Sequence, residues 1–213
     1  MKINRREERK TQRRASILEV ARRSFFEKGY AATTMSGIAA TLGGSKSTLW
    51  RYFSSKEELF AAVLDDATAE FKRELGELLL SHQGVRNTLM RLCLHFIEKL
   101  VDPRSIRLHR LIHGEGGRFP EIGLIFYERA PKNVEAILAA YLDHCIQEGS
   151  IRKVDTMIAA GNLIAVVMSG THQKMLLNVI TEATSADIRA DAENAVGMFM
   201  RAYGTGDDDL TAD

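Results

Sequence analysis

Cysteine and proline are both scarce in this chain of 213 residues, which contains two cysteines and three prolines. Small domains held together by disulfides use more cysteines, so the sequence indicates a protein of the reducing cytoplasm. With so few prolines and abundant leucine, alanine, glutamate and arginine, the composition favours helix over sheet. Cys93 and Cys145 each have apolar neighbours at helical spacing, and we interpret them as buried structural thiols rather than redox sensors.

Long hydrophobic runs are absent as well. The longest run, from Met157 to Met168, is interrupted by Gly161 and Asn162 and is too short to cross a bilayer. The N-terminus is charged and lacks the apolar stretch that a secretory signal needs. We therefore expect no membrane partner and a cytoplasmic location.

The motifs of common enzyme classes are missing too, since the sequence has no nucleophile elbow, phosphate loop or dinucleotide fingerprint. We expect neither catalysis nor a cofactor, and a helical enzyme or carrier is only an alternative. His109 and His113 stand at i and i+4 with Glu115 close by, and could form a metal pair. Because HExxH and a suitably spaced third ligand are both lacking, we interpret the histidines as polar lining or satisfied core residues and expect no metal.

Charge is distributed unevenly along the chain. Residues 1–60 hold 13 Lys and Arg against 6 Asp and Glu, a net charge of +7, whereas residues 61–213 hold 16 against 22, a net charge of −6. A basic front on an acidic body indicates a polyanionic partner for the front alone, although an ordinary solvated arm would have the same composition. The first residues supply much of this charge: Lys2, Arg5, Arg6, Arg9, Lys10, Arg13 and Arg14.

The recurrence of apolar residues at helical spacing predicts an all-α fold. We expect a basic arm at residues 1–11 that is disordered or only partly helical, and a disordered acidic tail at residues 204–213. Caps, glycines and prolines mark the ends of the helices between them. These helices are predicted at about residues 12–28, 34–42, 46–53, 55–80, 86–101, 104–113, 120–129, 131–149, 156–180 and 185–203.

The segment from Thr34 to Phe53, TMSGIAATLGGSKSTLWRYF, is the most informative about function. Two short helices flank a tight glycine turn, and the second helix has few apolar anchors: Leu49, Tyr52 and Phe53. Its other face is expected to present small and cationic residues: Lys46, Ser47, Thr48, Trp50 and Arg51. Such a face suits insertion into the major groove of DNA, about 12 Å wide. A generic αα-hairpin would explain the anchors but not an exposed Trp50 beside cations, so we interpret the segment as a helix-turn-helix.

This segment and its flanks resemble the TetR family of bacterial transcription regulators. The resemblance is close over residues 12–65 and is carried by these residues: Phe25–Tyr30 (FFEKGY), Thr33–Thr34, Ile38–Ala39 and, above all, Ser45–Leu59 (SKSTLWRYFSSKEEL). More weakly, His109–Arg129 (HRLIHGEGGRFPEIGLIFYER) and the helix after Pro131 are similar to one C-terminal subgroup. The resemblance implies an N-terminal three-helix DNA-binding domain, here residues 12–65, and a larger helical domain for dimerisation and ligand binding, here residues 66–203.

The resemblance also implies which residues contact DNA: Thr34, Ser45, Lys46, Ser47, Thr48, Trp50, Tyr52 and Lys56. Arg51, a cation on the open face of the second helix, is expected to contact DNA with them. Residues 45–48 would enter the groove, whereas Thr34 and Lys56, each at a helix N-terminus, would contact phosphates. Trp50 and Tyr52 stand where the family usually has tyrosines that touch the DNA backbone. The sequence departs from the family pattern at two positions. Trp50 can donate to phosphate only through its indole N–H. Gly44 stands where the family usually has an apolar residue, which predicts a looser turn.

Residues 86–127 contain more large apolar side chains than three short helices can bury between themselves. A few polar side chains are interleaved with them. A mostly apolar cavity with sparse orienting polar groups is typical of a small-molecule pocket, and a plain hydrophobic core is the alternative. We predict a pocket for a small apolar or aromatic effector that includes these residues: Phe96, His109, His113, Phe126 and Tyr127.

Together these features predict a ligand-responsive regulator of transcription, a homodimeric repressor that a small molecule releases from a palindromic operator in double-stranded DNA. Helices 131–149 and 156–180 are expected to pair with their two-fold mates in a four-helix interface. An architectural DNA-binding protein without an effector is the alternative, although the long C-terminal domain argues against it.

Overall fold

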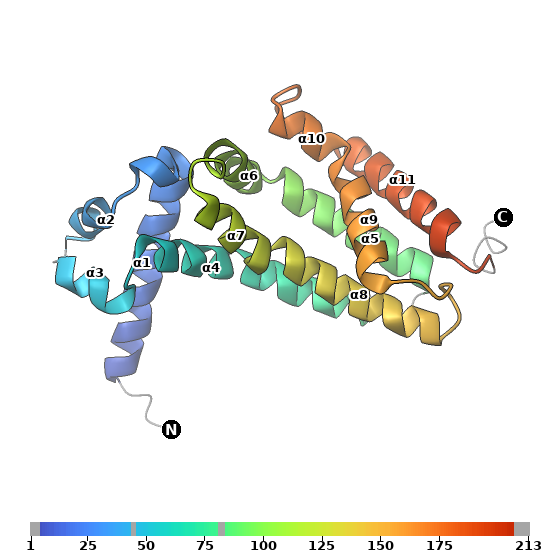
Figure 1. Ribbon diagram of the computed structural model, residues 1–213, viewed down its shortest axis with the longest axis horizontal. Helices are drawn as coiled ribbons and strands as arrows, with labels where there is room; N and C mark the ends of the chain where they lie inside the picture. The colour runs from blue at the N-terminus through green and yellow to red at the C-terminus, as the bar shows by residue number, and fades with distance from the viewer. Residues whose placement is uncertain (1–4, 44–45, 81–83, 207–213) are drawn as a thin grey trace. The chain divides into compact units, whose positions relative to one another are not determined.

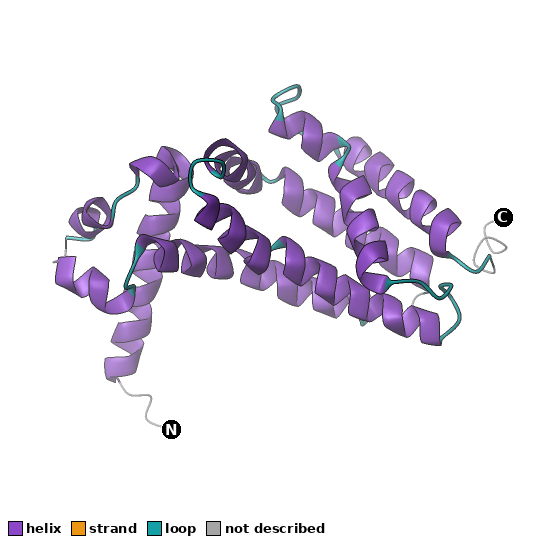
Figure 2. Cartoon of the chain, in the orientation of Figure 1, coloured by secondary structure: helices purple, strands orange, loops and turns teal. Residues whose placement is uncertain are grey.

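The computed structural model describes residues 5–43, 46–80 and 84–206. In this part of the chain all regular structure is helical, as predicted (Figure 1, Figure 2). The helices are α1 (Arg5–Ala32), α2 (Met35–Thr41), α3 (Lys46–Tyr52), α4 (Lys56–Leu79), α5 (Val85–Val101), α6 (Pro103–Glu115), α7 (Pro120–Arg129), α8 (Pro131–Gln147), α9 (Thr156–Met168), α10 (Thr171–Leu176) and α11 (Ser185–Tyr203).

The helices form two compact units. The first comprises the residues up to Ala69 together with Arg107–Ala130, and the second comprises Glu70–Ile106 and the residues from Pro131 onward. Helices α4 and α6 therefore each contribute to both units. The sequence-based boundary assigned residues 107–130 to the C-terminal domain. The structure places them with the N-terminal helices because Leu108, Leu111 and Ile122 are buried in the same core as α1, α2 and α3.

Four aromatic rings hold the first unit together. The Tyr30 ring packs edge-on against Phe60 and Phe119, with both pairs of centroids 5.4 Å apart, and it stacks on Phe25 at 5.7 Å. Phe25 in turn meets Phe60 edge-on at 5.1 Å. Such pairs stabilise beyond the area that they bury. Since Phe119 directly precedes α7, the cluster anchors the segment 107–130 to α1 and α4.

The first helix departs from the prediction at both of its ends. It begins at Arg5, so residues 5–11 of the expected basic arm are helical, while residues 1–4 lie outside the described part of the chain. The predicted end at Lys28 corresponds to a kink rather than a stop. Gly29 takes φ 86° and ψ 170°, a backbone conformation that glycine alone adopts readily, and one further turn follows to Ala32.

The second unit is a bundle in which α11 packs against α5 and α9, and α8 packs against α9. Buried side chains of α5 form its centre: Leu89, Leu92, Cys93, Phe96 and Ile97. Both cysteines are free and buried, which confirms the structural interpretation of Cys93 and Cys145. Burial raises the pKa of the Cys93 thiol to about 12, so this side chain is a neutral thiol rather than a reactive thiolate.

The predicted long apolar helix 156–180 is broken. Helix α9 ends at Met168, and α10 begins at Thr171 after a turn at Ser169 and Gly170. The Thr171 N–H donates to Asp191 Oδ2 at 2.6 Å, and the Asp191 carboxyl occupies the space that a Cβ on residue 170 would need. No helix in the described ranges combines the length and apolar character of a membrane span.

The first residues of the expected C-terminal tail make backbone contacts. Gly204 forms an isolated antiparallel bridge with Ile151, and the Thr205 hydroxyl donates to the carbonyl of Gly149 at 3.0 Å. These contacts fix the end of α11 beside the α8–α9 connection. Residues 207–213 lie outside the described part of the chain.

Two glycine substitutions should have opposite effects on stability. Gly170→Ala displaces Asp191 from Thr171 and should lower the free energy of unfolding by about 1–3 kcal/mol, the cost of a lost charge-assisted hydrogen bond. Gly76→Ala in α4 meets no neighbouring atom and should raise it by about 0.5–1 kcal/mol through helix propensity. Urea denaturation of both variants tests this, and a stabilised Gly170→Ala protein would contradict the role of Asp191.

Candidate nucleic-acid interface

Helices α2 and α3 form a helix-turn-helix next to α1 (Figure 1). Thr34 caps α2, since its side-chain oxygen accepts a hydrogen bond from the N–H of Gly37 at 3.0 Å. Ile38 and Ala39 of α2 are buried in the same core as Leu49 of α3. Gly43 has φ 61°, and the turn begins there. Gly44, predicted to loosen the turn, and Ser45, predicted to contact DNA, lie outside the described residues.

Helix α3 has one buried side and one open side. Leu49 and the adjacent Phe53 are buried, whereas Ser47, Trp50 and Arg51 are exposed. Trp50 is 49% exposed, and a tryptophan that serves only to pack the core would be more deeply buried. Thr48 and Tyr52 are half-buried, and Lys46 is the first residue of the helix. The exposed Trp50 that the sequence predicted is confirmed.

The start of α4 is fixed by hydrogen bonds between Glu58 and two serines. The Ser55 hydroxyl accepts from the N–H of Glu58 at 3.1 Å. The Glu58 carboxylate accepts from the Ser54 hydroxyl at 2.6 Å and from the Ser54 N–H at 2.7 Å, and these bonds lower the pKa of Glu58. These contacts close the connection between α3 and α4 within a few residues. They place Lys56 at the first position of α4, four residues after the end of α3.

The Lys56 side chain lies on an aromatic face. Its Nζ is 3.9 Å from the centroid of the Tyr30 ring, a distance typical of a cation–π contact. Partial burial lowers the pKa of Lys56, and the nearby carboxylates of Glu57, Glu115 and Glu121 oppose that shift. The Tyr30 hydroxyl donates to Glu57 Oε1 at 3.0 Å. The arrangement holds a cation at the N-terminal end of a helix, where a phosphate would also meet backbone N–H groups.

Arginines next to α3 also lie over rings. The Arg14 guanidinium is 5.5 Å from the centroid of Phe53, and the Arg51 guanidinium is 5.9 Å from that of Tyr52. Such contacts restrict the long side chains and leave their donors available to a planar or anionic partner. Arg9 and Lys10 of α1 are exposed as well. The first unit thus carries cations on α1, α3 and α4.

The five residues predicted for an effector pocket fall in both units. Phe96 stacks on Phe71 in the core of the second unit, with centroids 5.6 Å apart. In the first unit, buried His109 meets Phe126 edge-on at 5.5 Å, and His113 Nδ1 lies 2.7 Å from the carbonyl oxygen of His109. Tyr127 is about half exposed. The structure therefore brings together His109, His113 and Phe126.

Glu115 does not complete a metal site with His109 and His113. That carboxylate accepts hydrogen bonds from the backbone N–H groups of Tyr30 and Ala31 instead. Within the described ranges no three His, Cys, Asp or Glu side chains converge as metal ligands.

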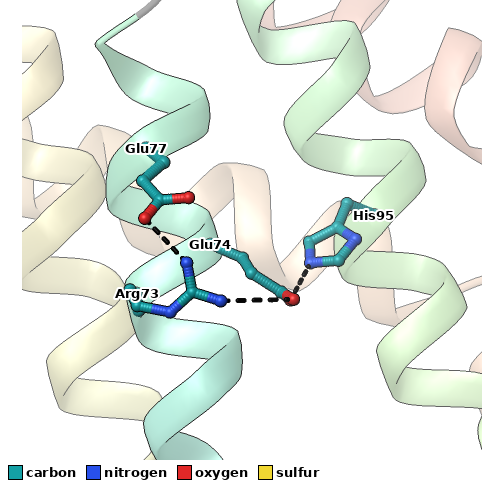
Figure 3. A network of polar contacts seen from close by, with 4 residues as sticks. All are labelled: Arg73, Glu74, Glu77 and His95. Atoms are coloured by element: carbon teal, nitrogen blue, oxygen red, sulfur yellow. Dashed lines mark hydrogen bonds and ion pairs between the residues drawn. The ribbon is translucent and has the colours of Figure 1, made fainter.

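A polar groove in the second unit was not predicted. It lies between α4 and α5, has a volume of about 350 Å³ and is lined by Glu74, Glu77, Leu78, Arg91 and His95. Figure 3 shows its polar contacts: Glu74 Oε2 lies 3.0 Å from His95 Nε2, and Arg73 pairs with Glu77 at 2.7 Å. The sequence gives no clear signal for this groove, because charges at i and i+3, such as Glu74 and Glu77 on α4, are also typical of an ordinary solvated helix face.

Two family models match this chain. Residues 17–63 match the bacterial regulatory proteins of the tetR family. Residues 87–205, more than half of the chain, match the C-terminal domain of AefR-like transcriptional repressors. The chain belongs to the TetR family. This TetR-family protein is accordingly a DNA-binding regulator of transcription, as the helix-turn-helix indicates.

Individual relatives agree with this assignment over nearly the whole chain. The HTH-type transcriptional regulator AcrR of Shigella flexneri is 24% identical over 202 residues, which cover 89% of this chain and 88% of AcrR. A TetR-family regulator from Mesorhizobium loti superimposes with a TM-score of 0.80 and 25% identity, over 92% of this chain and 98% of that one. The flavonoid-responsive regulator FrrA superimposes with a TM-score of 0.77 and 26% identity, over 92% and 99%. The predicted all-α fold is confirmed.

Two substitutions should separate phosphate contacts from base contacts. Lys56→Ala should weaken binding to all DNA sequences alike and reduce the slope of log affinity against log salt by about 0.9, the counterions released at one phosphate. Thr48→Ala should instead change which sequences are preferred. Fluorescence anisotropy with selected and random duplexes, over a range of salt concentrations, measures both. Altered preference in Lys56→Ala with unaltered preference in Thr48→Ala would reverse these roles.

Proposed function

We propose that this TetR-family regulator is a homodimeric repressor that a small apolar or aromatic molecule releases from a palindromic operator. The observation that carries the proposal is the open side of α3, where Ser47, Trp50 and Arg51 project from a helix anchored by Leu49. In this proposal residues 45–48 and Arg51 face the groove, while Thr34, Trp50, Tyr52 and Lys56 contact the backbone. The protein acts in the cytoplasm, where its DNA lies, and by binding rather than catalysis.

Exposed apolar residues in the second unit support a dimer. Ile158, Gly161 and Ala165 follow at i, i+3 and i+7 on α9, and Ile158 is 61% exposed in the single chain. On α11, which packs against α9, Met198 is exposed beside Gly197. Small residues next to large apolar ones allow helices of two subunits to approach closely.

Helix α8 presents a different surface. Its large apolar side chains are buried or half-buried, and its exposed positions are polar or small: Lys132, Ala136, Ala140, Asp143, His144 and Gln147. The sequence-based interface paired helices 131–149 and 156–180. The exposed side chains favour α9 and α11 instead, so we place the dimer face on these two helices. A two-fold dimer would set its recognition helices about 34–36 Å apart, one turn of DNA.

Introducing a charge tests the dimer face. Ala165→Arg places an arginine on the exposed side of α9 and should yield a monomer that binds the operator poorly, because an unpaired buried charge is costly in an interface. Ala140→Arg, on the exposed side of α8, is the matched control and should remain dimeric. Sedimentation velocity measures both. A dimeric Ala165→Arg protein beside a monomeric Ala140→Arg protein would move the interface to α8.

An aromatic effector is supported by two observations. FrrA, which is 26% identical, is described as flavonoid-responsive. In this chain, the His109 ring packs edge-on against Phe126, which combines an aromatic surface with a polar group, as ligand pockets do. We keep His113 and Tyr127 as further candidates in this unit, and Phe96 as a separate candidate in the second unit. An effect of about 1–3 kcal/mol on DNA binding is sufficient for a typical allosteric response. Because the relatives are named as regulators, the architectural alternative is not favoured.

A panel of flavonoids and simpler aromatic compounds tests the effector class. At least one compound should raise the melting temperature and release DNA, and Phe126→Ala should blunt both responses while the free protein still binds DNA. Leu124→Ala, on the same helix but 64% exposed, serves as the control and should respond like the unmodified protein. An unchanged response in Phe126→Ala, or no thermal shift across the panel, would remove the support for this pocket.

A further inference from the structure

The Glu115 carboxylate forms a bridge within the first unit that is separate from the proposed DNA contacts. Glu115 is the last residue of α6. Its Oε1 accepts from the N–H of Tyr30 at 2.8 Å, and its Oε2 accepts from the N–H of Ala31 at 2.7 Å. Both oxygens of one side chain are thus engaged by consecutive backbone amides, 84 and 85 residues away in sequence.

The kink at Gly29 explains why these amides need an acceptor. Because the backbone leaves helical geometry there, the turn after it begins like a new helix, whose first N–H groups have no carbonyl partner. A carboxylate is the preferred acceptor at such a position, since charge-assisted hydrogen bonds are the stronger kind. The fit is close: a Cβ on residue 29 would overlap Glu115 Oε1. Glycine at 29 and glutamate at 115 therefore form one structural device.

Tyr30 connects this device to the DNA-binding surface. Its side chain is buried, its hydroxyl donates to Glu57, and its ring face carries the Lys56 ammonium. Burial and the bond to Glu57 raise the pKa of Tyr30, so the phenol is the donor at neutral pH. The Glu115 bridge holds the backbone of the residue that supports the first two residues of α4.

We propose that Glu115 is a positioning residue for DNA binding. It closes the Gly29 kink, which fixes Tyr30, and Tyr30 in turn sets Lys56 for its contact with phosphate. The inference rests on the proposed phosphate contact of Lys56. It predicts that loss of the Glu115 carboxylate weakens DNA binding, even though a negative charge is removed from a surface that faces a polyanion.

Two effects oppose each other in this prediction. Removing a carboxylate reduces repulsion of DNA, but exposed charges are largely screened beyond about 8 Å at physiological salt. Losing the bridge leaves the backbone N–H groups of Tyr30 and Ala31 without their charged acceptor. Tyr30 is then no longer held in place, and its ring contacts Lys56 directly. Glu121 separates the two effects. The Glu121 carboxylate acts on Lys56 through charge, whereas Glu115 is the residue that accepts hydrogen bonds from the backbone N–H groups of Tyr30 and Ala31.

A double-mutant cycle tests the proposal. The probe is a duplex that the unmodified protein selects from a random library, and affinity is measured by anisotropy over a range of salt concentrations. Glu115→Gln should lose about tenfold in affinity and about 0.9 in salt slope, as Lys56→Ala does. The double variant should be no weaker than Lys56→Ala alone, because both act at one contact. Glu121→Gln should lose no affinity.

The cycle has distinct adverse outcomes. Additive losses, or a Glu115→Gln protein with a normal salt slope, would overturn the positioning role and leave the Lys56 contact intact. A Lys56→Ala protein with a normal slope would overturn that contact and this inference with it.

Amide hydrogen exchange in the unmodified protein is a second test, and it needs no variant. Since coupling is reciprocal, DNA should slow exchange at Tyr30 and Ala31, and exchange that DNA leaves unchanged would also overturn the proposal.

Discussion

The left-handed backbone at Gly29 is the constraint on which the DNA-binding unit depends. In a regular helix from Arg5 to Ala32, the helical period would fix the direction of the residue 30 side chain relative to Phe25. The kink instead lets the Tyr30 ring stack on Phe25 and pack edge-on against Phe60 and Phe119. Rings from α1, α4 and the start of α7 thereby share one core. The cost of the irregular backbone is offset by the Glu115 hydrogen bonds and by aromatic burial.

This core is what allows α3 to be short. A helix of seven residues has no independent stability in water, because the cost of nucleation exceeds the gain from so few hydrogen bonds. Leu49 and Phe53 anchor it in the core, and α2 packs along it. With only these anchors buried, the rest of the surface is free for polar side chains and Trp50. The composition of α3 thus follows from two requirements, minimal anchoring and maximal exposure.

Local signals predicted the helix-turn-helix well. The start of α2 at Thr34 and the start of α4 near residue 55 are each readable within a few residues, and both are confirmed. The features that were missed depend on distant partners. The break at Gly170 reflects Asp191, and the packing of residues 107–130 into the first unit reflects rings from α1 and α4. Nothing near Glu115 in sequence indicates that its acceptors serve Tyr30.

Two helices bear on how a ligand could affect DNA binding. Helices α4 and α6 are the two that contribute to both units, and each has one end in the first unit. The end of α4 places Lys56 on the ring of Tyr30, and the end of α6 places Glu115 on its backbone amide. A ligand shifts an equilibrium only by its unequal affinity for two arrangements. If those arrangements differ in α4 or in α6, either difference reaches the same buried tyrosine, and through it the cation proposed to hold the DNA backbone.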